Sequence, residues 1–332
     1  MSSGGSSFLI IRGVQGVKTC GLAGGLLMLW HGIACSQDYP SARALRILTS
    51  QPGSGSDLVA RILVERLPEV FGQHAVVDNR GILAPEVAAK APPDGYTVLF
   101  YSTPLWVSPL LQAKPQWNVA KDFAPVTLAV NAPNLLTVHP SLSVKSVGEL
   151  LVLAKARPGE LDYGSGSAGS SSHLAAELFN AMAGVHMARI PYRGVGPALV
   201  GLLGGQVQVL FPSASSGLPH VKSGRMRVLA VTSAKPTALL PDLPTVAASG
   251  VPGYEADTPL GVFLPAGTPA KIIAQLHKAI IVVLNFPEAK KRLLAHGAEV
   301  IGSSPAEFGA WLESDVARWS KLIREKGMRE EL

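Results

Sequence analysis

Two runs of glycine and serine have the composition best suited to bind a ligand: residues 52–57 (PGSGSD) and residues 164–172 (GSGSAGSSS). Before the first run, residues 45–49 alternate as in a strand. After it, apolar residues recur at helical spacing from Leu58 to Leu67. A helix start has unpaired backbone N–H groups and the positive end of the helix dipole. The first run is therefore expected to bind a carboxylate or a phosphate group at Ser54–Asp57.

The second run repeats this design. Leu161–Tyr163 reads as a short strand before it, and His173–Met182 has the pattern of an amphipathic helix after it. Its N–H and hydroxyl groups are the donors that a carboxylate needs. The sequence thus predicts two anion-binding loops of one kind.

Two enzymatic alternatives use the same residues. Gly164, Gly166 and Gly169 have the spacing of a dinucleotide fingerprint, but the next strand ends without the acidic residue that would bind a ribose. Ser167 as a nucleophile would lack the first glycine of the nucleophile elbow, and no acid stands out to complete a triad with His173. His173 is instead expected to cap or orient the loop. An exported hydrolase or an NADP oxidoreductase remains the enzymatic alternative.

Asp57 has two alternative roles. It could cap the first helix, and it is four residues before Arg61, which is the spacing of an ion pair on one helix face. Direct contact with a ligand is the second role, although a carboxylate there would repel an anion. Capping is taken as its main role.

Several other classes of function are not supported. The histidines are dispersed, with no paired-ligand spacing and no accompanying cysteines, and no P-loop is present, so we expect no metal and no cofactor. The net charge of +6 is modest, only 6% of residues are aromatic, and no basic cluster is interleaved with aromatics. Nucleic acid is therefore not an expected partner.

The first 36 residues have the features of a secretory signal peptide. Arg12 and Lys18 precede an apolar core at Gly21–Trp30, which is too short to span a bilayer and is followed by small residues. A lipid anchor on Cys35 is the alternative, although the preceding residues match a lipoprotein box poorly. We expect an exported protein that, without Cys20 and Cys35, has no disulfide and relies on its core.

The rest of the chain alternates strands with helices, which predicts an α/β fold with mainly parallel sheets. Extended segments near Asn131 and Tyr254 join two sheet regions, so we expect two lobes with a cleft between them. Lobe 1 is assigned to residues 40–131 and 257–332, and lobe 2 to residues 132–256. The expected strands are 45–49, 74–80, 96–101, 123–130, 134–139, 161–163, 188–192, 207–211, 228–232 and 261–264, and the expected helices are 58–67, 84–90, 147–156, 173–182, 195–203, 270–284, 287–296 and 305–326.

Taken together, the motifs resemble those of the Bug family, the extracytoplasmic solute receptors of tripartite tricarboxylate transporters. The resemblance covers nearly the whole chain after residue 40, in order. The matching stretches are GSGSDLVAR (53–61), VDNR (77–80), PDGYT (93–97), DFAPVTLAV (122–130), LDYGSGSAGSSSHLAAE (161–177), PYRGVGPAL (191–199), GGQVQVLF (204–211), LAVTS (229–233), LPTV (243–246) and PAGTP (265–269).

The resemblance implies a periplasmic binding protein of the type II, Venus-flytrap kind, with two lobes, two interlobe crossings and a small carboxylated solute between them. Its partners would be the two membrane subunits of the transporter, and we expect the receptor to be a monomer. A sensing role beside a membrane histidine kinase is the alternative. The ligand-binding residues implied by position are Ser54, Ser56, Asp57, Ser102 and Thr103 from one lobe, and Ser165, Ser167, Ser170, Tyr192, Gly194 and Ser213 from the other.

The chain departs from the family pattern in two places. After Arg80 the family usually has a longer, glycine-rich run that approaches the ligand, whereas this chain continues with the shorter, less glycine-rich stretch Gly81–Glu86. Loss of glycines removes close backbone approach. In addition, Pro212 stands where the family commonly has an aspartate. Both departures predict an altered or weakened solute site.

Overall fold

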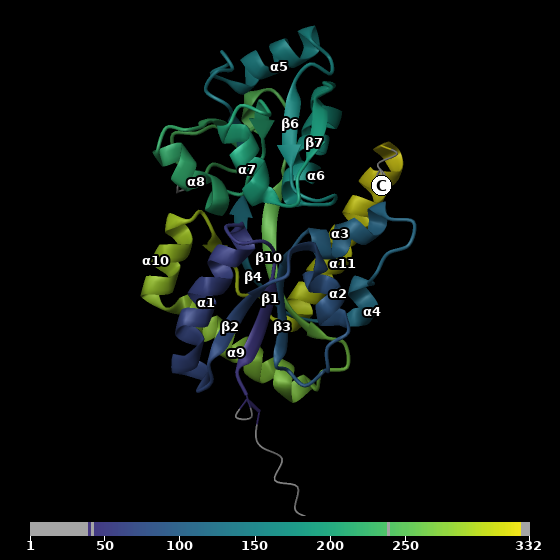
Figure 1. Ribbon diagram of the computed structural model, residues 1–332, viewed down its shortest axis with the longest axis vertical. Coiled ribbons are helices and arrows are strands. Elements are labelled where there is room, and N and C mark those ends of the chain that lie inside the picture. Colours follow the sequence, from purple (N-terminus) through teal and green to yellow (C-terminus); the bar gives the residue numbers. More distant parts are fainter. Residues whose placement is uncertain (1–38, 41–42, 238–239, 327–332) are drawn as a thin grey trace, which may run out of the picture. The chain divides into compact units, whose positions relative to one another are not determined.

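The computed structural model describes residues 39–40, 43–237 and 240–326. The predicted signal peptide, with Cys35, lies outside the described residues. The described strands form two sheets, and Figure 1 shows β4 and β10 running between them. The strands of the first sheet belong mainly to predicted lobe 1, and those of the second sheet belong to predicted lobe 2. The lobe boundaries at residues 131/132 and 256/257 stay a prediction.

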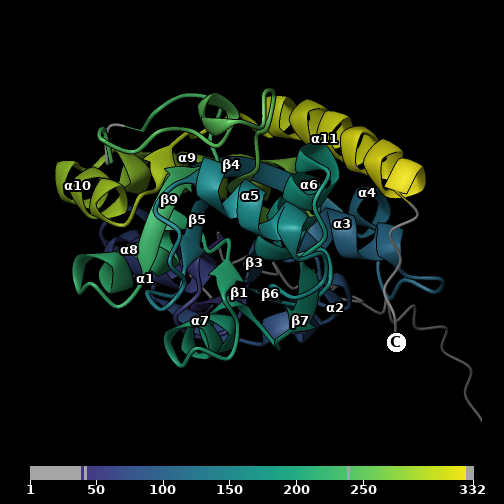
Figure 2. The same ribbon diagram turned by 90° about the horizontal axis from the view of Figure 1, so that it is seen from above.

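The first sheet has the strand order β11-β4-β10-β3-β1-β2. Its strands are β1 (Leu45–Thr49), β2 (Ala75–Asn79), β3 (Thr97–Ser102), β4 (Phe123–Pro133), β10 (Asp257–Pro265) and β11 (Glu299–Val300). Helices cover both faces, and Figure 2 shows α1 and α10 to one side of β1 and β3 and α2 and α3 to the other. These helices, with their short companions, are α1 (Gly55–Phe71), η1 (Gly81–Leu83), α2 (Ala84–Ala89), α3 (Pro104–Leu111), α4 (Val119–Asp122), α9 (Ala270–Asn285), α10 (Pro287–Ala295) and α11 (Pro305–Lys326).

The second sheet has the order β7-β6-β8-β5-β9. Its strands are β5 (Leu135–Val138), β6 (Asp162–Ser165), β7 (Ala188–Pro191), β8 (Val209–Leu210) and β9 (Arg227–Val231). The helices of this part of the chain are α5 (Val147–Ala156), α6 (Ser171–Ala183), α7 (Val195–Leu203), α8 (Ala214–Lys222) and η2 (Ala247–Ser249).

Both sheets are mixed, so the prediction of mainly parallel sheets is wrong. Parallel pairs join β1 to β2 and β3, and β6 to β7 and β8. Strand β10 is antiparallel to β3 and β4, and β5 is antiparallel to β8 and β9. The reason is topological: a chain that leaves the first sheet along β4 and returns along β10 must run in opposite directions on the two strands.

Strand β4 is also longer than predicted, because it continues through Asn131 and Pro133 instead of stopping before them. Asn131 pairs with Pro259, and Pro133 pairs with Asp257. Pairing with β10 therefore overrides the turn tendency of the local sequence. Three α-helices, α3, α4 and α8, were not expected, and α3 and α8 each contain an internal proline.

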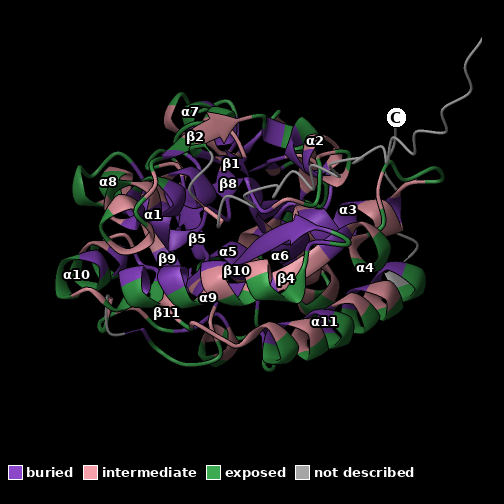
Figure 3. Cartoon of the chain, turned by 90° about the horizontal axis from the view of Figure 1, so that it is seen from below, coloured by how far each residue is buried: buried purple, intermediate pink, exposed green. Residues whose placement is uncertain are grey.

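The first sheet has a separate core on each face because its strand residues alternate. Val98 and Phe100 of β3 belong to the core beneath α1, α9 and α10. Leu99 and Tyr101 belong to the core beneath α2, α3 and α11. Figure 3 shows buried residues along β10 and exposed residues on the outer turns of α9 and α11. A third core, around Tyr163 and Phe179, fills the second sheet and its helices.

In the described part of the chain, no single helix is long and apolar enough to cross a membrane. Helices α9 and α10 together meet the length and composition requirement, but they are bent by 73° relative to each other.

Candidate functional site

The two glycine/serine runs face each other across a small pocket, here called the donor pocket, with a cavity of about 60 Å³. Its lining residues come from the parts of the chain around both sheets, including β10 of the first sheet. The lining residues are Ser50, Gln51, Ser54, Gly55, Ser56, Tyr101, Ser102, Pro104, Gly166, Ser167, Ser170, Ser171, Gly194, Val195, Ser213, Thr258 and Leu260.

The first run and Ser50, just before it, supply a cluster of three hydroxyl groups at the start of α1. Ser54 is the N-cap of the helix, and its Oγ accepts from Asp57 N at 3.2 Å. Ser50 Oγ lies 2.7 Å from Ser54 Oγ and is also hydrogen-bonded to Ser56 Oγ. Because hydroxyl groups can rotate, this cluster can redirect its O–H donors towards an anion.

Asp57 lies outside the donor pocket and is occupied by the protein itself. Its Oδ2 accepts from Gly53 N at 2.9 Å, and its Oδ1 accepts from Arg61 Nε at 3.0 Å and Asn79 Nδ2 at 2.9 Å. Ser54 and Asp57 thus bond to backbone donors in both directions, as in a capping box. The expected ion pair with Arg61 is confirmed, and a capping role suits Asp57 better than ligand contact.

The second run is held in shape by hydrogen bonds to the start of α6. Ser170 is the N-cap and accepts from His173 N at 3.3 Å. Ser172 Oγ accepts from Gly166 N at 3.0 Å, and His173 Nδ1 accepts from Gly169 N at 3.1 Å. The expected orienting role of His173 is confirmed.

His173 is neutral in the folded protein. Burial lowers its pKa to about 3, and the positive charge of Arg189 acts in the same direction. Its Nδ1 accepts a backbone N–H rather than the Ser167 hydroxyl, so this nitrogen does not serve as a base for Ser167. The geometry expected of a serine nucleophile with His173 is not formed at that atom.

Three other residues predicted to bind the ligand, Ser165, Tyr192 and Thr103, do not line the donor pocket. Ser165 Oγ is fully buried, accepts from Arg189 Nε at 2.9 Å and donates to Gly166 O at 3.1 Å, beneath the second run. Tyr192 OH bonds to Gln206 Oε1 at 3.3 Å. Thr103 lines a larger cavity, described below. Ligand contact by these residues and by Asp57 stays a prediction.

The structure therefore brings seven predicted residues together at the donor pocket: Ser54, Ser56, Ser102, Ser167, Ser170, Gly194 and Ser213. The sequence interpretation missed Ser50 and Gln51, although they directly follow β1 and precede the first run. Gly55, Gly166 and Ser171 lie within the two runs predicted to bind an anion, but they were not among the individual ligand residues predicted. Thr258 and Leu260 had no local signal, because only the pairing of β10 places them at the pocket.

The segment after Arg80, which is expected to be shorter than in the family, lies next to Gln51. A Cβ at Gly81 would lie 2.8 Å from Gln51 Nε2, and a Cβ at Gly194 would lie 2.8 Å from Gln51 Oε1. Gln51 Nε2 also donates to Arg193 O. The glutamine therefore occupies the space between this segment and the second lobe. Neither this segment nor Pro212 is among the lining residues of the donor pocket.

The electrostatics of the donor pocket come from helix starts and hydroxyl groups. Among the residues that the structure describes, no charged side chain lines it. Helices α1, α3, α6, α7 and α8 all begin at or directly after lining residues. Helix N-termini and hydroxyl donors together favour a negatively charged ligand group.

A second, larger cavity of about 450 Å³ lies across β10, and we call it the acidic cavity. Thr258 and Leu260 line the donor pocket, whereas Asp257 and Pro259 line the acidic cavity. Alternation along the strand explains this division. The lining residues of the acidic cavity are Thr103, Leu128, Asn131, Ser171, Leu174, Ala175, Glu255, Ala256, Asp257, Pro259, Ile301, Trp311, Ser314, Asp315, Arg318 and Trp319.

Two α/β lobes joined by two crossing segments, with a donor-lined pocket between them, define a solute-binding receptor of the periplasmic-binding-protein class. Residues 59–328 match the family model described as "Tripartite tricarboxylate transporter family receptor". The chain belongs to this family, so the resemblance to the Bug receptors is confirmed.

Individual relatives agree with this assignment. Protein BugT of Bordetella pertussis is 33% identical over 314 residues, which cover 92% of this chain and 96% of BugT. The solved structure "R. palustris Rpa4515 with adipate" is 36% identical with a TM-score of 0.85, covering 88% of this chain and 99% of that one. MatC from Rhodopseudomonas palustris with bound malate is 26% identical with a TM-score of 0.81, covering 85% and 99%. The family and these neighbours are solute-binding receptors.

Proposed function

We propose that this protein captures a small organic acid between its lobes and delivers it to the membrane subunits of a tripartite transporter, without chemical change. One observation carries the proposal: the donor pocket combines five helix starts with serine hydroxyls, and none of the described residues that line it is charged. Such neutral donors can bind a carboxylate.

A dicarboxylate suits the pocket because donors come from both lobes. Ser54 and Ser56 can bind one carboxylate from the first lobe, while Ser167 and Ser170 can bind the other from the second. Two relatives support this choice, since their structures are described with adipate and with malate, and both compounds are dicarboxylates.

Binding requires the lobes to part. The cavity of about 60 Å³ is far below the roughly 300–1,000 Å³ that is typical of small-molecule sites. Contacts between the lobes close it: Ser108 Oγ donates to Ala168 O at 2.7 Å, and Gln51 Nε2 donates to Arg193 O. We infer hinge motion about β4 and β10, with closure around the solute.

We place this function in the periplasm, after removal of residues 1–36, and we expect the receptor to act as a monomer. The support is the family, whose members are extracytoplasmic receptors of such transporters, and the signal-like sequence of residues 1–36.

The test is calorimetry with the mature, ligand-stripped protein and a panel that contains adipate, malate, aromatic acids, amino acids and neutral sugars. We expect one dicarboxylate to bind at a single site. The variant Ser167→Ala should weaken it by about 10- to 100-fold, because a hydrogen bond to a charged group contributes about 1.5–3 kcal/mol. Ser141→Ala, on the exposed surface, is the matched control.

The proposal fails if no acid binds while a neutral solute does and Ser167→Ala abolishes that binding. A turnover of any panel compound that is lost in Ser167→Ala would favour the hydrolase alternative instead.

A further inference from the structure

The acidic cavity contains most of the unpartnered buried polar atoms of the described residues. Five buried side-chain atoms of the described residues have no hydrogen-bond partner, and four of them belong to residues that line this cavity. They are Thr103 Oγ1, Asn131 Oδ1, Asp257 Oδ1 and Trp319 Nε1. The side chains of Thr103 and Trp319 are only 2% and 5% exposed. Buried polar groups are nearly always partnered, so their concentration at one cavity needs an explanation.

The charges around the cavity are unbalanced. Asp315 is partnered, since its Oδ1 accepts from Arg318 Nη2 at 2.7 Å and its Oδ2 from Trp106 Nε1 at 2.7 Å. Glu255 and Asp257 have no cationic group within 4.0 Å among the described residues. Arg318 also lines the cavity and acts on Asp257, but from beyond ion-pair distance. These two carboxylates therefore leave the cavity with an excess of negative charge.

Asp257 shows the effect of this environment. Its Oδ2 accepts from Asn131 Nδ2 at 2.9 Å, while its Oδ1 is unpartnered. Burial raises the pKa of Asp257 to about 6, and the negative charges of Glu255 and Glu299 act in the same direction. A positive charge bound beside Asp257 would favour its ionised form.

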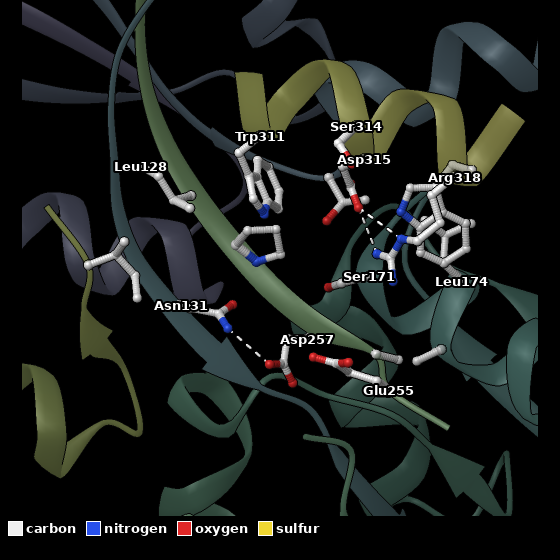
Figure 4. A pocket seen from close by; sticks show the side chains of 16 residues that line it. Leu128, Asn131, Ser171, Leu174, Glu255, Asp257, Trp311, Ser314, Asp315 and Arg318 are labelled. Atoms are coloured by element: carbon white, nitrogen blue, oxygen red, sulfur yellow. Dashed lines mark hydrogen bonds and ion pairs between the residues drawn. The ribbon is translucent and has the colours of Figure 1, made fainter. Parts of the chain in front are cut away.

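The remaining lining suits the apolar part of an organic molecule. Figure 4 shows Trp311, Glu255, Asp257 and Asp315 around the hollow, with Leu128 and Leu174 at its sides. Aromatic faces attract organic cations. The guanidinium of Arg318 lies 5.0 Å from the ring centroid of Trp319, so Trp311 is the indole left for a ligand.

We propose that the acidic cavity is a second ligand site beside the donor pocket, with which it shares Ser171, and that it binds a small organic cation bearing a protonated amine. The exposed Glu255 makes the first contact. Rotation of the Asn131 and Asp257 side chains then brings their unpartnered oxygens to the ammonium group. The alkyl part of the ligand packs on Trp311 and Leu174. This site does not depend on the nature of the solute in the donor pocket.

The test is calorimetry of the mature protein with ethylamine, putrescine and choline at pH 8, with sodium acetate as the anionic counterpart. We expect an amine to bind at one site, and Glu255→Gln or Asp257→Asn to weaken it at least 10-fold. Glu313→Gln is the matched control, because Glu313 is an exposed acid of α11 outside the cavity lining. Glu255 is exposed, so its variant reports on binding even if Asp257→Asn destabilises the fold.

The pH dependence gives an independent readout. The groups facing Asp257 are Asn131, Glu255, Glu299 from β11 and Arg318 from α11. We expect amine binding to weaken at least fivefold between pH 8 and pH 5, as Asp257 takes up a proton. The proposal is wrong if no amine binds at pH 8, or if Ser167→Ala abolishes amine binding while Glu255→Gln and Asp257→Asn do not weaken it.

Discussion

Gly55 is the residue at which closure of the lobes can be tested most directly. It is the first residue of α1 and lies against the start of α8 in the other lobe. A Cβ at this position would overlap Ser215 Oγ and would lie 2.9 Å from Ser213 Oγ. The variant Gly55→Ala should therefore oppose the closed arrangement while leaving each lobe intact.

The size of the effect follows from these contacts. Ser215 Oγ would have to rotate away and give up its 3.0 Å hydrogen bond with Ser213 Oγ, which costs about 0.5–1.5 kcal/mol. The remaining tight contact with Ser213 adds overpacking of about 1–3 kcal/mol. Together these two costs give about 1.5–4.5 kcal/mol, so the Kd of the solute would rise at least about 10-fold.

Gly55→Ala should not destabilise the open, solute-free protein, because the lobes are apart there and the added Cβ does not meet Ser213 or Ser215. Alanine at a helical position without a positive φ restricts the unfolded chain, so the free energy of unfolding without solute should stay equal or rise by at most about 1 kcal/mol. Gly148→Ala is the matched control: Gly148 is the second residue of α5, and a Cβ there meets nothing closer than 3.9 Å.

The assay is calorimetry with the dicarboxylate that the wild-type protein binds, together with urea unfolding of the solute-free protein. Small-angle scattering with solute should show a larger radius of gyration for Gly55→Ala than for Gly148→Ala. An unchanged Kd in Gly55→Ala, or an equal loss in both variants, would refute the inferred role of this contact in closure.

Three further predictions concern titration and lobe contact. The folded pKa of His173, about 3, lies below the ordinary 6.5, so its stabilising effect is complete above pH 6.5 and declines as pH falls. The wild-type protein should lose unfolding free energy between pH 7 and pH 5, and His173→Gln should reduce this loss by about 2 kcal/mol, measured by urea unfolding. The same change of unfolding free energy with pH in variant and wild type would contradict this. Asp257 has the opposite sign, because its folded pKa of about 6 exceeds the ordinary 3.8 and the wild type loses stability as pH rises through this window. Between pH 4 and 7, Asp257→Asn should remove up to about 3 kcal/mol of the wild-type loss in unfolding free energy. If the unfolding free energies of variant and wild type change in parallel with pH, this prediction is wrong. Finally, Ser108→Ala removes the 2.7 Å hydrogen bond from Ser108 Oγ to Ala168 O. Because one hydrogen bond contributes about 1 kcal/mol, calorimetry should show about a fivefold higher Kd for the solute. An equal Kd would show that this bond does not favour closure.

Helices with visible end signals were predictable to the residue. Helix α5 begins after Ser146, whose Oγ accepts from Glu149 N, and the expected bounds Val147–Ala156 are confirmed. The expected bounds of α7 and α11 are also confirmed, although α7 begins after Gly194 without a side-chain cap. The strand–loop–helix design of both glycine/serine runs was also predictable, because each depends on residues close together in the sequence.

Features that depend on distant pairing were not predictable. Pro133 reads as the end of a strand, but its pairing with Asp257 extends β4 past it. The start of α8 was read as a loop, because Ser213 follows a proline and Pro219 lies within the helix. The acidic cavity joins β4, β10, α6 and α11, which are far apart in sequence, so no local pattern could indicate it.

The alternation along β10 limits how this protein can change. Asp257 and Pro259 serve one cavity, and Thr258 and Leu260 serve the other. Because the side-chain period of a strand is two, inserting or deleting one residue there would exchange the two linings at once. The strand is therefore a poor place for gradual adaptation to a new ligand. Variation in specificity among relatives should concentrate in the loops before α1, α6 and α8, where a replacement alters one lining only.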